Sequence, residues 1–260
     1  MTTTGQKTNH REQEILAELR LAGGSCRVGY LAERLGVSDE TVRRNIKALQ
    51  AKTQVRKVHG GVLLNEDMTL TEQPFQTRLR HNADAKRRIA AKFATMISDG
   101  DSLFLDIGST TAYAAQALRK RRRLYIVTNS LAVANTLAMI NDNRVFFTGG
   151  ELRTHDGGAF GQDAIRFIQR FNVQFAVFSA GAINAENGFM LHDIGEADLS
   201  RQAAARAQTR IVLADSEKFM LRAPITVADP SGFDILITEA QPPGGVAEML
   251  SQHDIALVVT

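Results

Sequence analysis

The residues best suited to binding an anion follow short apolar runs in the last two-thirds of the chain. A turn with the sequence Gly-Ser-Thr-Thr, residues 108–111, comes after one such run and opens a helical pattern. Such a turn offers backbone N–H groups, hydroxyls and a helix N-terminus to a phosphate. Small, hydroxyl and amide residues follow four further runs, with two cations among them. The predicted ligand-binding residues are Asp106, Gly108, Ser109, Thr110, Thr111, Thr128, Asn129, Ser130, Gly149, Gly150, Arg153, Ala180, Gly181, Glu196 and Lys218.

Apolar runs that alternate with helical patterns are expected to bring these residues together. Near-continuous apolar runs are typical of strands covered on both faces, and their alternation with helices indicates a parallel sheet. Ligands of such sheets bind beyond the carboxyl ends of the strands. Each motif alone is common in turns, but five in the same topological position indicate a site for a compact phosphorylated polyol or sugar. The predicted strands are 102–106, 124–128, 145–148, 175–180, 210–214, 234–238 and 255–259, and the helices between them include 86–96, 112–118, 131–139, 164–169 and 198–207.

A second group of candidate residues lies near the start of the chain and suits DNA. Helical spacing predicts helices over 11–21, 28–35 and 39–51, and a hairpin of strands 54–59 and 62–64 follows. Two helices joined by a short Gly-containing turn form the helix-turn-helix pattern, whose second helix enters the major groove. The predicted DNA-binding residues are Ser38, Thr41, Arg43, Arg44, Asn45, Lys47, Arg56, Lys57 and His59.

Within this group, the arginines are expected to bind guanine edges and Asn45 an adenine, while Ser38, Thr41 and the hairpin contact phosphates. A solvated basic helix face is the alternative interpretation of Arg43 and Arg44. The capping Ser38, the turn and the hairpin that follows together favour DNA binding.

The distribution of charge supports this division. Residues 1–60 carry 11 Lys and Arg against 6 Asp and Glu, a net +5, whereas residues 61–260 carry 20 against 22, a net −2. The first quarter of the chain is therefore the part that attracts a polyanion. No apolar run is long enough to cross a bilayer, the N-terminal residues lack a signal core, and a single cysteine, Cys26, fits a reducing compartment. We expect a cytoplasmic protein with no membrane partner.

Several segments resemble the DeoR family of transcriptional repressors along nearly the whole chain. They are LAERLGVS (31–38), TVRRNI (41–46) and HGG (59–61) in the first part, then DIGSTT (106–111), GGELR (149–153), DGG (156–158), DSEK (215–218) and TEAQPP (238–243). The resemblance implies a winged helix and a sensor domain similar in fold to ribose-5-phosphate isomerase. DIGSTT and DSEK match the phosphate-holding parts of that fold, which implies that Lys218 contacts a phosphate. GGELR, DGG and TEAQPP are most similar to the glycerol-3-phosphate regulon repressor branch, which implies glycerol-3-phosphate as the leading effector.

Three positions depart from the family pattern. Asn45 stands where Asp is usual, Lys52-Thr53 replaces a usual Gly, and Ser200 stands where Lys is usual. The first two put the operator sequence and the wing angle in doubt, although neither removes the basic face of the helix.

Catalysis by an isomerase of this fold is the main alternative. Such an enzyme needs a base and polarising groups beside the phosphate, but residues 179–184 contain no acid and Glu196 stands alone. A lone Glu is more often a hydroxyl ligand or a structural residue. The histidines lack metal-ligand spacing. We therefore expect neither an enzyme, a cofactor nor a metal.

The sequence thus predicts an α/β protein with a winged helix-turn-helix domain over 1–65, a linker over 66–82 and a Rossmann-like three-layer sensor domain over 83–260. We expect a repressor that a small phosphorylated metabolite releases from operator DNA. An activator that responds to another sugar phosphate stays open. Because one winged helix offers little interface, a homodimer or homotetramer that binds repeated half-sites is expected.

Overall fold

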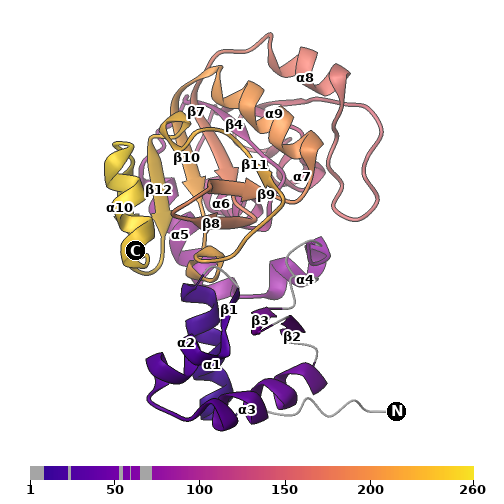
Figure 1. The fold of residues 1–260 in the computed structure, drawn as a ribbon. Helices are drawn as coiled ribbons and strands as arrows, with labels where there is room; N and C mark the ends of the chain where they lie inside the picture. Colours follow the sequence, from indigo (N-terminus) through magenta and orange to yellow (C-terminus); the bar gives the residue numbers. More distant parts are fainter. Residues whose placement is uncertain (1–8, 23–24, 53–54, 59, 65–71) are drawn as a thin grey trace. The chain divides into compact units, whose positions relative to one another are not determined.

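A computed structural model of the protein describes residues 9–22, 25–52, 55–58, 60–64 and 72–260 (Figure 1). The chain divides into two compact units, residues 1–71 and 72–260. Of the predicted linker, residues 72–82 belong to the larger unit, because Phe75 is buried there and Lys86 binds the carbonyls of Arg78 and His81.

The smaller unit contains three helices and a three-stranded sheet. The helices are α1 (His10–Leu21), α2 (Val28–Leu35) and α3 (Asp39–Ala51), and the strands are β1 (Ser25–Arg27), β2 (Val55–Val58) and β3 (Gly61–Leu64) in the order β1-β3-β2. Their apolar faces meet in one core that includes Ile15, Leu31, Val42, Ile46 and Leu49. The three predicted helices and the hairpin are confirmed, and the short strand β1 is an addition.

A short turn between α2 and α3 sets the angle of α3 relative to α2. Gly36 ends α2 in the left-handed conformation (φ 61°), which glycine adopts without steric cost. The hydroxyl of Ser38 then caps α3 by accepting a hydrogen bond from the Thr41 N–H (3.3 Å). Asp39 and Glu40 lie in the first turn of α3, where the helix dipole stabilises negative charge.

The larger unit is built on a seven-stranded parallel sheet in the order β13-β12-β10-β7-β4-β5-β6. All seven predicted strands are confirmed, with ends that shift by one to three residues. The strands are β4 (Ser102–Leu105), β5 (Tyr125–Thr128), β6 (Arg144–Phe147), β7 (Val173–Ser179), β10 (Ala207–Leu213), β12 (Ile235–Thr238) and β13 (Ala256–Val259).

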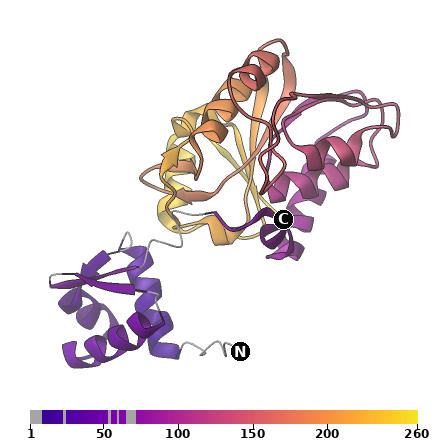
Figure 2. The same cartoon turned by 90° about the vertical axis from the view of Figure 1, so that its right-hand side faces the viewer.

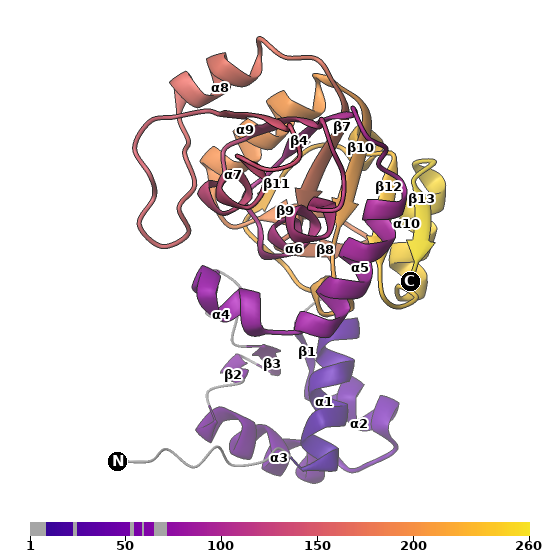
Figure 3. The same ribbon diagram turned by 180° about the vertical axis from the view of Figure 1, so that it is seen from behind.

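Helices cover both faces of this sheet, as Figures 2 and 3 show. The helices α5 (Ala83–Thr95), α6 (Ser109–Leu118) and α7 (Leu131–Leu137) pack on one face; α8 (Gln162–Ile168), α9 (Ile194–Ala204) and α10 (Gly244–Gln252) pack on the other. Successive strand residues point to opposite faces, so Leu103 and Leu105 join the first core and Phe104 the second. The predicted three-layer fold is confirmed.

The order of the strands reverses between β4 and β7. The chain starts at β4, continues outward through β5 and β6, and returns to β7 on the other side of β4. Such a switch point leaves a crevice at the carboxyl ends of the two neighbouring strands, where open α/β sheets bind ligands.

Several smaller elements were not predicted. A three-stranded antiparallel sheet joins β8 (Ala182–Asn184), β9 (Gly188–Leu191) and β11 (Ile225–Thr226) in the order β11-β9-β8. Helix α10, the short helix α4 (Phe75–Arg80) and two 3-10 turns, η2 (Ser216–Lys218) and η3 (Pro230–Gly232), complete the unit.

Candidate effector site and candidate DNA surface

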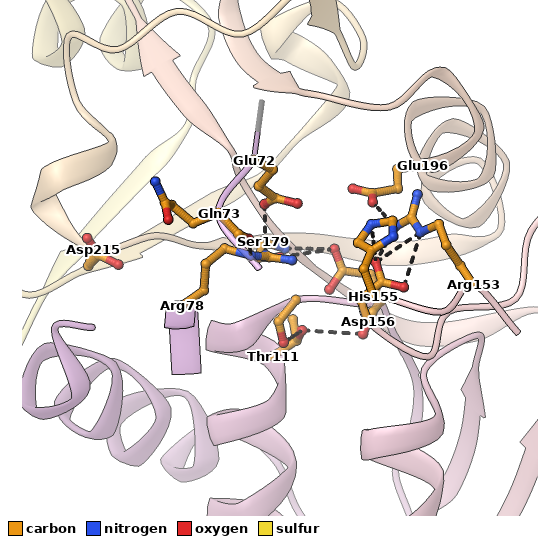
Figure 4. A network of polar contacts seen from close by, with 12 residues as sticks. Glu72, Gln73, Arg78, Thr111, Arg153, His155, Asp156, Ser179, Glu196 and Asp215 are labelled. Carbon is orange, nitrogen blue, oxygen red and sulfur yellow. Dashed lines mark hydrogen bonds and ion pairs between the residues drawn. The ribbon is translucent and has the colours of Figure 1, made fainter. Parts of the chain in front are cut away.

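The predicted ligand-binding residues lie at one edge of the large sheet. Because all seven strands are parallel, the segments that follow β4, β5, β6, β7 and β10 leave the sheet at the same edge. The structure therefore brings together the segments 106–111, 128–130, 148–153, 179–181 and 214–218. Figure 4 shows the polar contacts among several of their side chains.

The segment after β4 is joined to the segment after β7 across the switch point. The Asp106 Oδ2 atom accepts a hydrogen bond from the backbone N–H of Ser179 (2.8 Å). The Thr111 hydroxyl donates to the Gly108 carbonyl (2.9 Å) and closes the turn that begins α6. Ser109 and Thr110, the first two residues of that helix, are buried. The turn thus has the expected place at a helix N-terminus, where N–H groups favour an anion.

Burial dominates the electrostatics of Asp106. The side chain is almost fully enclosed, and loss of solvation raises the pKa of its carboxyl to about 7, although hydrogen bonds from Ser179 and Thr111 and the charge of Arg78 oppose this shift. Asp106 is therefore an acceptor within the protein, and its protonation changes near neutral pH.

The segment after β5 is held mainly by its own hydrogen bonds. Thr128 Oγ1 donates to the Leu105 carbonyl (2.6 Å) and accepts from the Ser130 N–H (3.0 Å). Ser130 caps α7 by accepting from the Val133 N–H (3.3 Å). These two hydroxyls orient the loop, and the Asn129 Nδ2 donates to the Ala159 carbonyl (3.4 Å), which leaves the Asn129 Oδ1 as the group without a hydrogen-bond partner.

Four buried side-chain oxygens at this edge have no hydrogen-bond partner among the described residues. They follow β4, β5, β6 and β10, and they are Asp106 Oδ1, Asn129 Oδ1, Thr148 Oγ1 and Asp215 Oδ2. Buried polar groups are normally hydrogen-bonded, so the loss of solvation at Asp106 Oδ1, Asn129 Oδ1 and Thr148 Oγ1 is not offset by a hydrogen bond, while Asp215 Oδ2 has only an ion pair with Lys86 at 3.7 Å. Their convergence on one edge points to a polar ligand that supplies donors there.

Arg153, one of the predicted ligand-binding residues, is bound by acidic side chains of the protein. Its guanidinium binds the carboxylates of Asp156 (Nε–Oδ2, 3.0 Å), Glu196 and, at 3.4 Å, Asp193, and it stacks over the ring of Phe160. Three carboxylates surround this cation, so Arg153 would bring an already paired guanidinium to the ligand.

Glu196 is buried beside Arg153 on α9. Burial raises the pKa of the Glu196 carboxyl to about 8; the negative charge of Glu72 adds to the shift, and Arg153 and Arg78 oppose it. Glu196 is therefore not alone, contrary to the sequence interpretation, because Arg153 and Asp156 lie beside it.

Three residues of this region were not predicted from the sequence, namely Glu72, Arg78 and Lys86, and they lie in the predicted linker or just after it. Arg78 on α4 ion-pairs with Glu72 (2.7 Å), and its charge acts on Asp106 and Glu196. Lys86 on α5 is buried, donates to the carbonyls of Arg78 (2.8 Å) and His81 (2.6 Å), and lies 3.7 Å from Asp215. The segment DAK at 84–86, inside a helical pattern, was the only feature of the sequence that pointed to these residues.

The remaining predicted ligand residues lie on the loops after β6, β7 and β10. Gly149 and Gly150 have positive φ angles of 73° and 97°, which lets their backbone turn at the edge of the sheet. A Cβ on Gly181, next to Ala180, would lie 2.8 Å from His192 Nδ1. Lys218 is the last residue of η2. The first residue of η2, Ser216, donates its backbone N–H and its hydroxyl to the carboxylate of Glu239 (3.0 and 2.6 Å).

A hollow of about 450 Å³ lies at the opposite, amino ends of β4, β7 and β10. Two of its polar residues are already engaged, because Gln174 accepts from the Ser102 N–H (2.7 Å) and donates to Asp101 (3.2 Å). We place the candidate site at the carboxyl ends, where the buried oxygens lack partners.

In the smaller unit, a basic face is exposed on α3. Arg43, Arg44 and Lys47 are exposed, and the nearest acid to Arg43 is Asp39 at 3.9 Å. Ser38 is also exposed, Thr41 is half-buried, and Arg56 and Lys57 are exposed on β2. His59 lies outside the described residues.

Asn45 departs from the prediction. Its side chain is buried, and its Nδ2 donates to the Thr41 carbonyl (2.8 Å) one turn earlier in α3. The expectation that Asn45 shares the exposed face is wrong, because Asn45 lies three residues after Val42 and four before Leu49, which are both buried on the core side of α3.

Lys52 also has a defined role. Its Nζ donates to Oε2 of the buried Glu12 (2.6 Å) and ties the end of α3 to α1, and this hydrogen bond holds the pKa of Glu12 below its usual value. In the described ranges, no group of three or more His, Cys, Asp and Glu could hold a metal, and no helix there is long and apolar enough to cross a membrane.

Comparisons with known families match both units. Residues 11–68 match the DeoR-like helix-turn-helix domain, and residues 81–240 match the DeoR C terminal sensor domain. A glycerol-3-phosphate regulon repressor of Escherichia coli is 34% identical over 251 residues, which cover 96% of this chain and 98% of that protein. The repressor CsqR of the same organism is 30% identical (100% and 98%), and an L-fucose operon activator of Haemophilus influenzae is 30% identical (96% and 100%).

Solved structures resemble the chain more weakly. Ribose 5-phosphate isomerase A of Methanocaldococcus jannaschii aligns with 53% of this chain and 55% of its own, at 18% identity and a TM-score of 0.40.

Proposed function

Because this chain belongs to the DeoR family of transcriptional regulators, we propose that it is a repressor that binds operator DNA through α3 and the β2–β3 wing. A small phosphorylated polyol or sugar, bound at the carboxyl edge of the large sheet, would release it. Glycerol-3-phosphate is the leading candidate, since the 34% identical relative is named for that regulon. An activator among the relatives makes the sign of regulation part of the test.

The observation that carries the effector part is the set of unpartnered buried oxygens beside the 108–111 turn. A polyol hydroxyl can donate to Asp106 Oδ1, Asn129 Oδ1 and Thr148 Oγ1, while a phosphate accepts from N–H groups at the start of α6. Lys218 would supply a cation to the phosphate. A polyol phosphate has both kinds of group, which a plain anion or a plain sugar lacks.

The observation that carries the DNA part is the exposed cationic face of α3. Arg43, Arg44 and Lys47 project from a helix whose other side is fixed in the core by Val42, Ile46 and Leu49. Such a helix can enter the major groove as a rigid body, with Arg56 and Lys57 of the wing on phosphates. Asn45 is left out of the proposed contacts because it is buried.

We propose that the protein regulates without catalysing a reaction, because relatives that match nearly the whole chain are named as transcriptional regulators. The acidic residues of the site are also engaged within the protein. Glu196 binds Arg153, and Asp106 accepts from Ser179. An isomerase needs such a group available as a base for the substrate carbon.

Two substitutions in the full chain test the proposal. Arg43→Ala should weaken binding to a duplex selected from random-sequence DNA by about 10- to 100-fold while leaving ligand affinity unchanged. Lys218→Ala should weaken binding of glycerol-3-phosphate, measured by calorimetry, and leave DNA affinity unchanged. Lys120→Ala removes an exposed cation elsewhere in the larger unit and is the matched control.

Addition of glycerol-3-phosphate to the complex of the protein with DNA shows whether the effector weakens or strengthens DNA binding. Loss of the complex supports release by the effector, whereas a tighter complex would contradict it. If no sugar or polyol phosphate binds the wild-type chain, the effector part of the proposal fails.

The assembly is also proposed. Repeated half-sites require at least two copies of α3, so we propose a homodimer or homotetramer. Light scattering of the full chain, with and without the selected duplex, measures the number of copies.

A further inference from the structure

An ion pair between Glu72 and Arg78 lies in the candidate effector site, and neither residue has a role in the function proposed above. Arg78 Nη1 contacts Glu72 Oε1 at 2.7 Å, and the two side chains are 11% and 19% exposed, in the order Arg78 and Glu72. Glu72 is the first residue of the larger unit, directly after the segment that connects it to the DNA-binding unit. A regulatory role for this ion pair rests on the proposed function and concerns the same site.

The charges of this pair act on two acidic groups of the site, Asp106 and Glu196. The charge of Arg78 acts on both Asp106, after β4, and Glu196, on α9, while the charge of Glu72 acts on Glu196. Figure 4 shows Glu72 and Arg78 between Asp215 and the Arg153–Glu196 cluster. On the other side, the Arg78 carbonyl accepts from Lys86. An anion bound beside Asp106 would therefore meet the Arg78 guanidinium.

The cations of this region differ in how firmly their present partners hold them. Arg153 is held by three carboxylates, and Asp156, one of them, is fully buried. Lys86 is buried and donates to two carbonyls. Arg78 has one carboxylate partner, Glu72, besides the Gln73 carbonyl (2.9 Å).

Glu72 is the carboxylate that can leave most easily. Among the described residues, no group other than Arg78 hydrogen-bonds to or ion-pairs with its side chain, and it sits at the end of the folded unit rather than inside an element. Asp106, Asp156 and Glu196 are instead buried and fixed on the sheet edge, the 148–158 loop and α9.

Because of the charges around it, Arg78 cannot bind Glu72 and a phosphate anion at the same time. Glu72 already neutralises Arg78, and the neighbouring cation Arg153 is already bound by Asp156, Glu196 and Asp193. A phosphate added to this cluster is repelled unless a carboxylate moves away, because like charges within a few ångströms in a poorly solvated place strongly disfavour each other.

We propose that Glu72 is an internal competitor of the anionic effector: its carboxylate neutralises Arg78 in the DNA-binding state, and the phosphoryl group of the effector replaces it there. Arg78 is then an effector-binding residue, and release of Glu72 frees the start of the larger unit where the connection to the DNA-binding unit attaches. Because coupling is reciprocal, a change that removes the Glu72 charge favours effector binding and disfavours the DNA-binding state.

Glu72→Gln in the full chain tests the competition, because the amide keeps the size of the side chain and loses its charge. Titration with inorganic phosphate and with glycerol-3-phosphate, followed by calorimetry at constant ionic strength, should show about tenfold tighter binding than in the wild type. Arg78→Gln should lose most of the affinity for both probes. Glu186→Gln, which breaks an exposed ion pair with Arg222 (2.8 Å) outside the site, should leave both affinities unchanged.

The same variants are then measured for DNA binding without ligand. Glu72→Gln should bind the selected duplex several-fold more weakly than the wild type, and Glu186→Gln should bind it equally well. Equal phosphate affinity in Glu72→Gln and a binding-competent wild type would overturn the competition and leave the proposed function intact. A wild type that binds neither probe overturns the effector part of the proposed function instead, and circular dichroism of each variant shows that it is folded.

Discussion

Gly108 and Ser179 lie so close across the β4–β7 switch point that a Cβ on Gly108 would be 1.8 Å from Ser179 Oγ and 2.7 Å from its Cβ. The φ angle of Gly108, −153°, is one that any residue can adopt, so contact rather than backbone conformation requires glycine here. This approach allows Asp106 to accept its hydrogen bond from the Ser179 N–H. The turn that is proposed to hold the phosphate is thereby set by the neighbouring strand.

Gly108→Ala is expected to destabilise the larger unit by about 1–3 kcal/mol, because the new methyl group overlaps Ser179 and forces the turn away from β7. Urea denaturation measures this loss. The double substitution Gly108→Ala with Ser179→Gly removes the overlapping atoms and should recover part of it. Additive effects of the two changes would contradict a direct contact.

The buried Asp106 predicts a pH dependence of stability. Its folded pKa of about 7 lies above the ordinary value of 3.8, so the folded state binds more protons, and this contribution to stability is complete below about pH 4 and lost as pH rises through 7. The free energy of unfolding should fall by on the order of 1.4 kcal/mol for each unit of the shift.

Asp106→Asn isolates this effect, since the amide oxygen can still accept from Ser179 and does not titrate. Denaturation at pH 5 and pH 8 should give a smaller difference for the variant than for the wild type. The Glu196 carboxyl, raised to a pKa of about 8 by burial, contributes a slope of the same sign that both proteins keep. Identical slopes in the two proteins would refute the assignment to Asp106.

Lys86 is expected to hold α4 against the sheet edge. Lys86→Met removes the donor to the Arg78 and His81 carbonyls and leaves the buried Asp215 without its cation, which should cost about 3–5 kcal/mol. Lys92→Met, an exposed position on the same helix, is the matched control and should change stability by less than about 0.5 kcal/mol. A similar loss in both variants would show that the methionine, and not the lost contacts, is responsible.

Lys52 gives a comparable prediction for the smaller unit. Lys52→Met leaves the buried Glu12 carboxylate without its cation and should cost about 3–5 kcal/mol at pH 7. Because Lys52 lowers the Glu12 pKa, its stabilising effect is present at pH values above the ordinary 4.5 and is lost as pH falls through the lowered pKa. The difference between variant and wild type should therefore shrink in acid. Addition of Glu12→Gln to the variant should recover stability at pH 7, and no recovery would exclude an unpaired charge as the cause.

The seven strands of the large sheet were predictable because each is a short, nearly continuous apolar run bounded by turn residues. Strands such as β4 are buried on both faces, and this burial leaves a clear mark in the sequence. The antiparallel strands β8, β9 and β11 were missed because they have two to four residues and lie between loops, where length gives no period to recognise.

The edge of the site was predictable from topology, but the state of each side chain was not. Parallel strands bring residues 106, 129 and 148 together whatever their environment. Whether a cation is free depends on contacts distant in sequence, such as Glu196 with Arg153, forty-three positions apart. Glu72 and Arg78 were missed for the same reason, since a polar segment with weak periodicity gave no indication that it packs on the sheet.

The switch point has a consequence for engineering and for evolutionary change. The two halves of the large sheet meet only where β4 pairs with β7, and each loop at the carboxyl edge leaves from a different strand of that scaffold. Exchange of the loop after β6 therefore leaves the pairing of the seven strands intact, but a replacement must keep the ion pair of Arg153 with Glu196 and the bridge of Gly158 with Ser130. Chimaeras that transplant residues 148–158 between related proteins should fold as their parents do when these contacts are kept, and so offer a route to sensors that report a chosen metabolite.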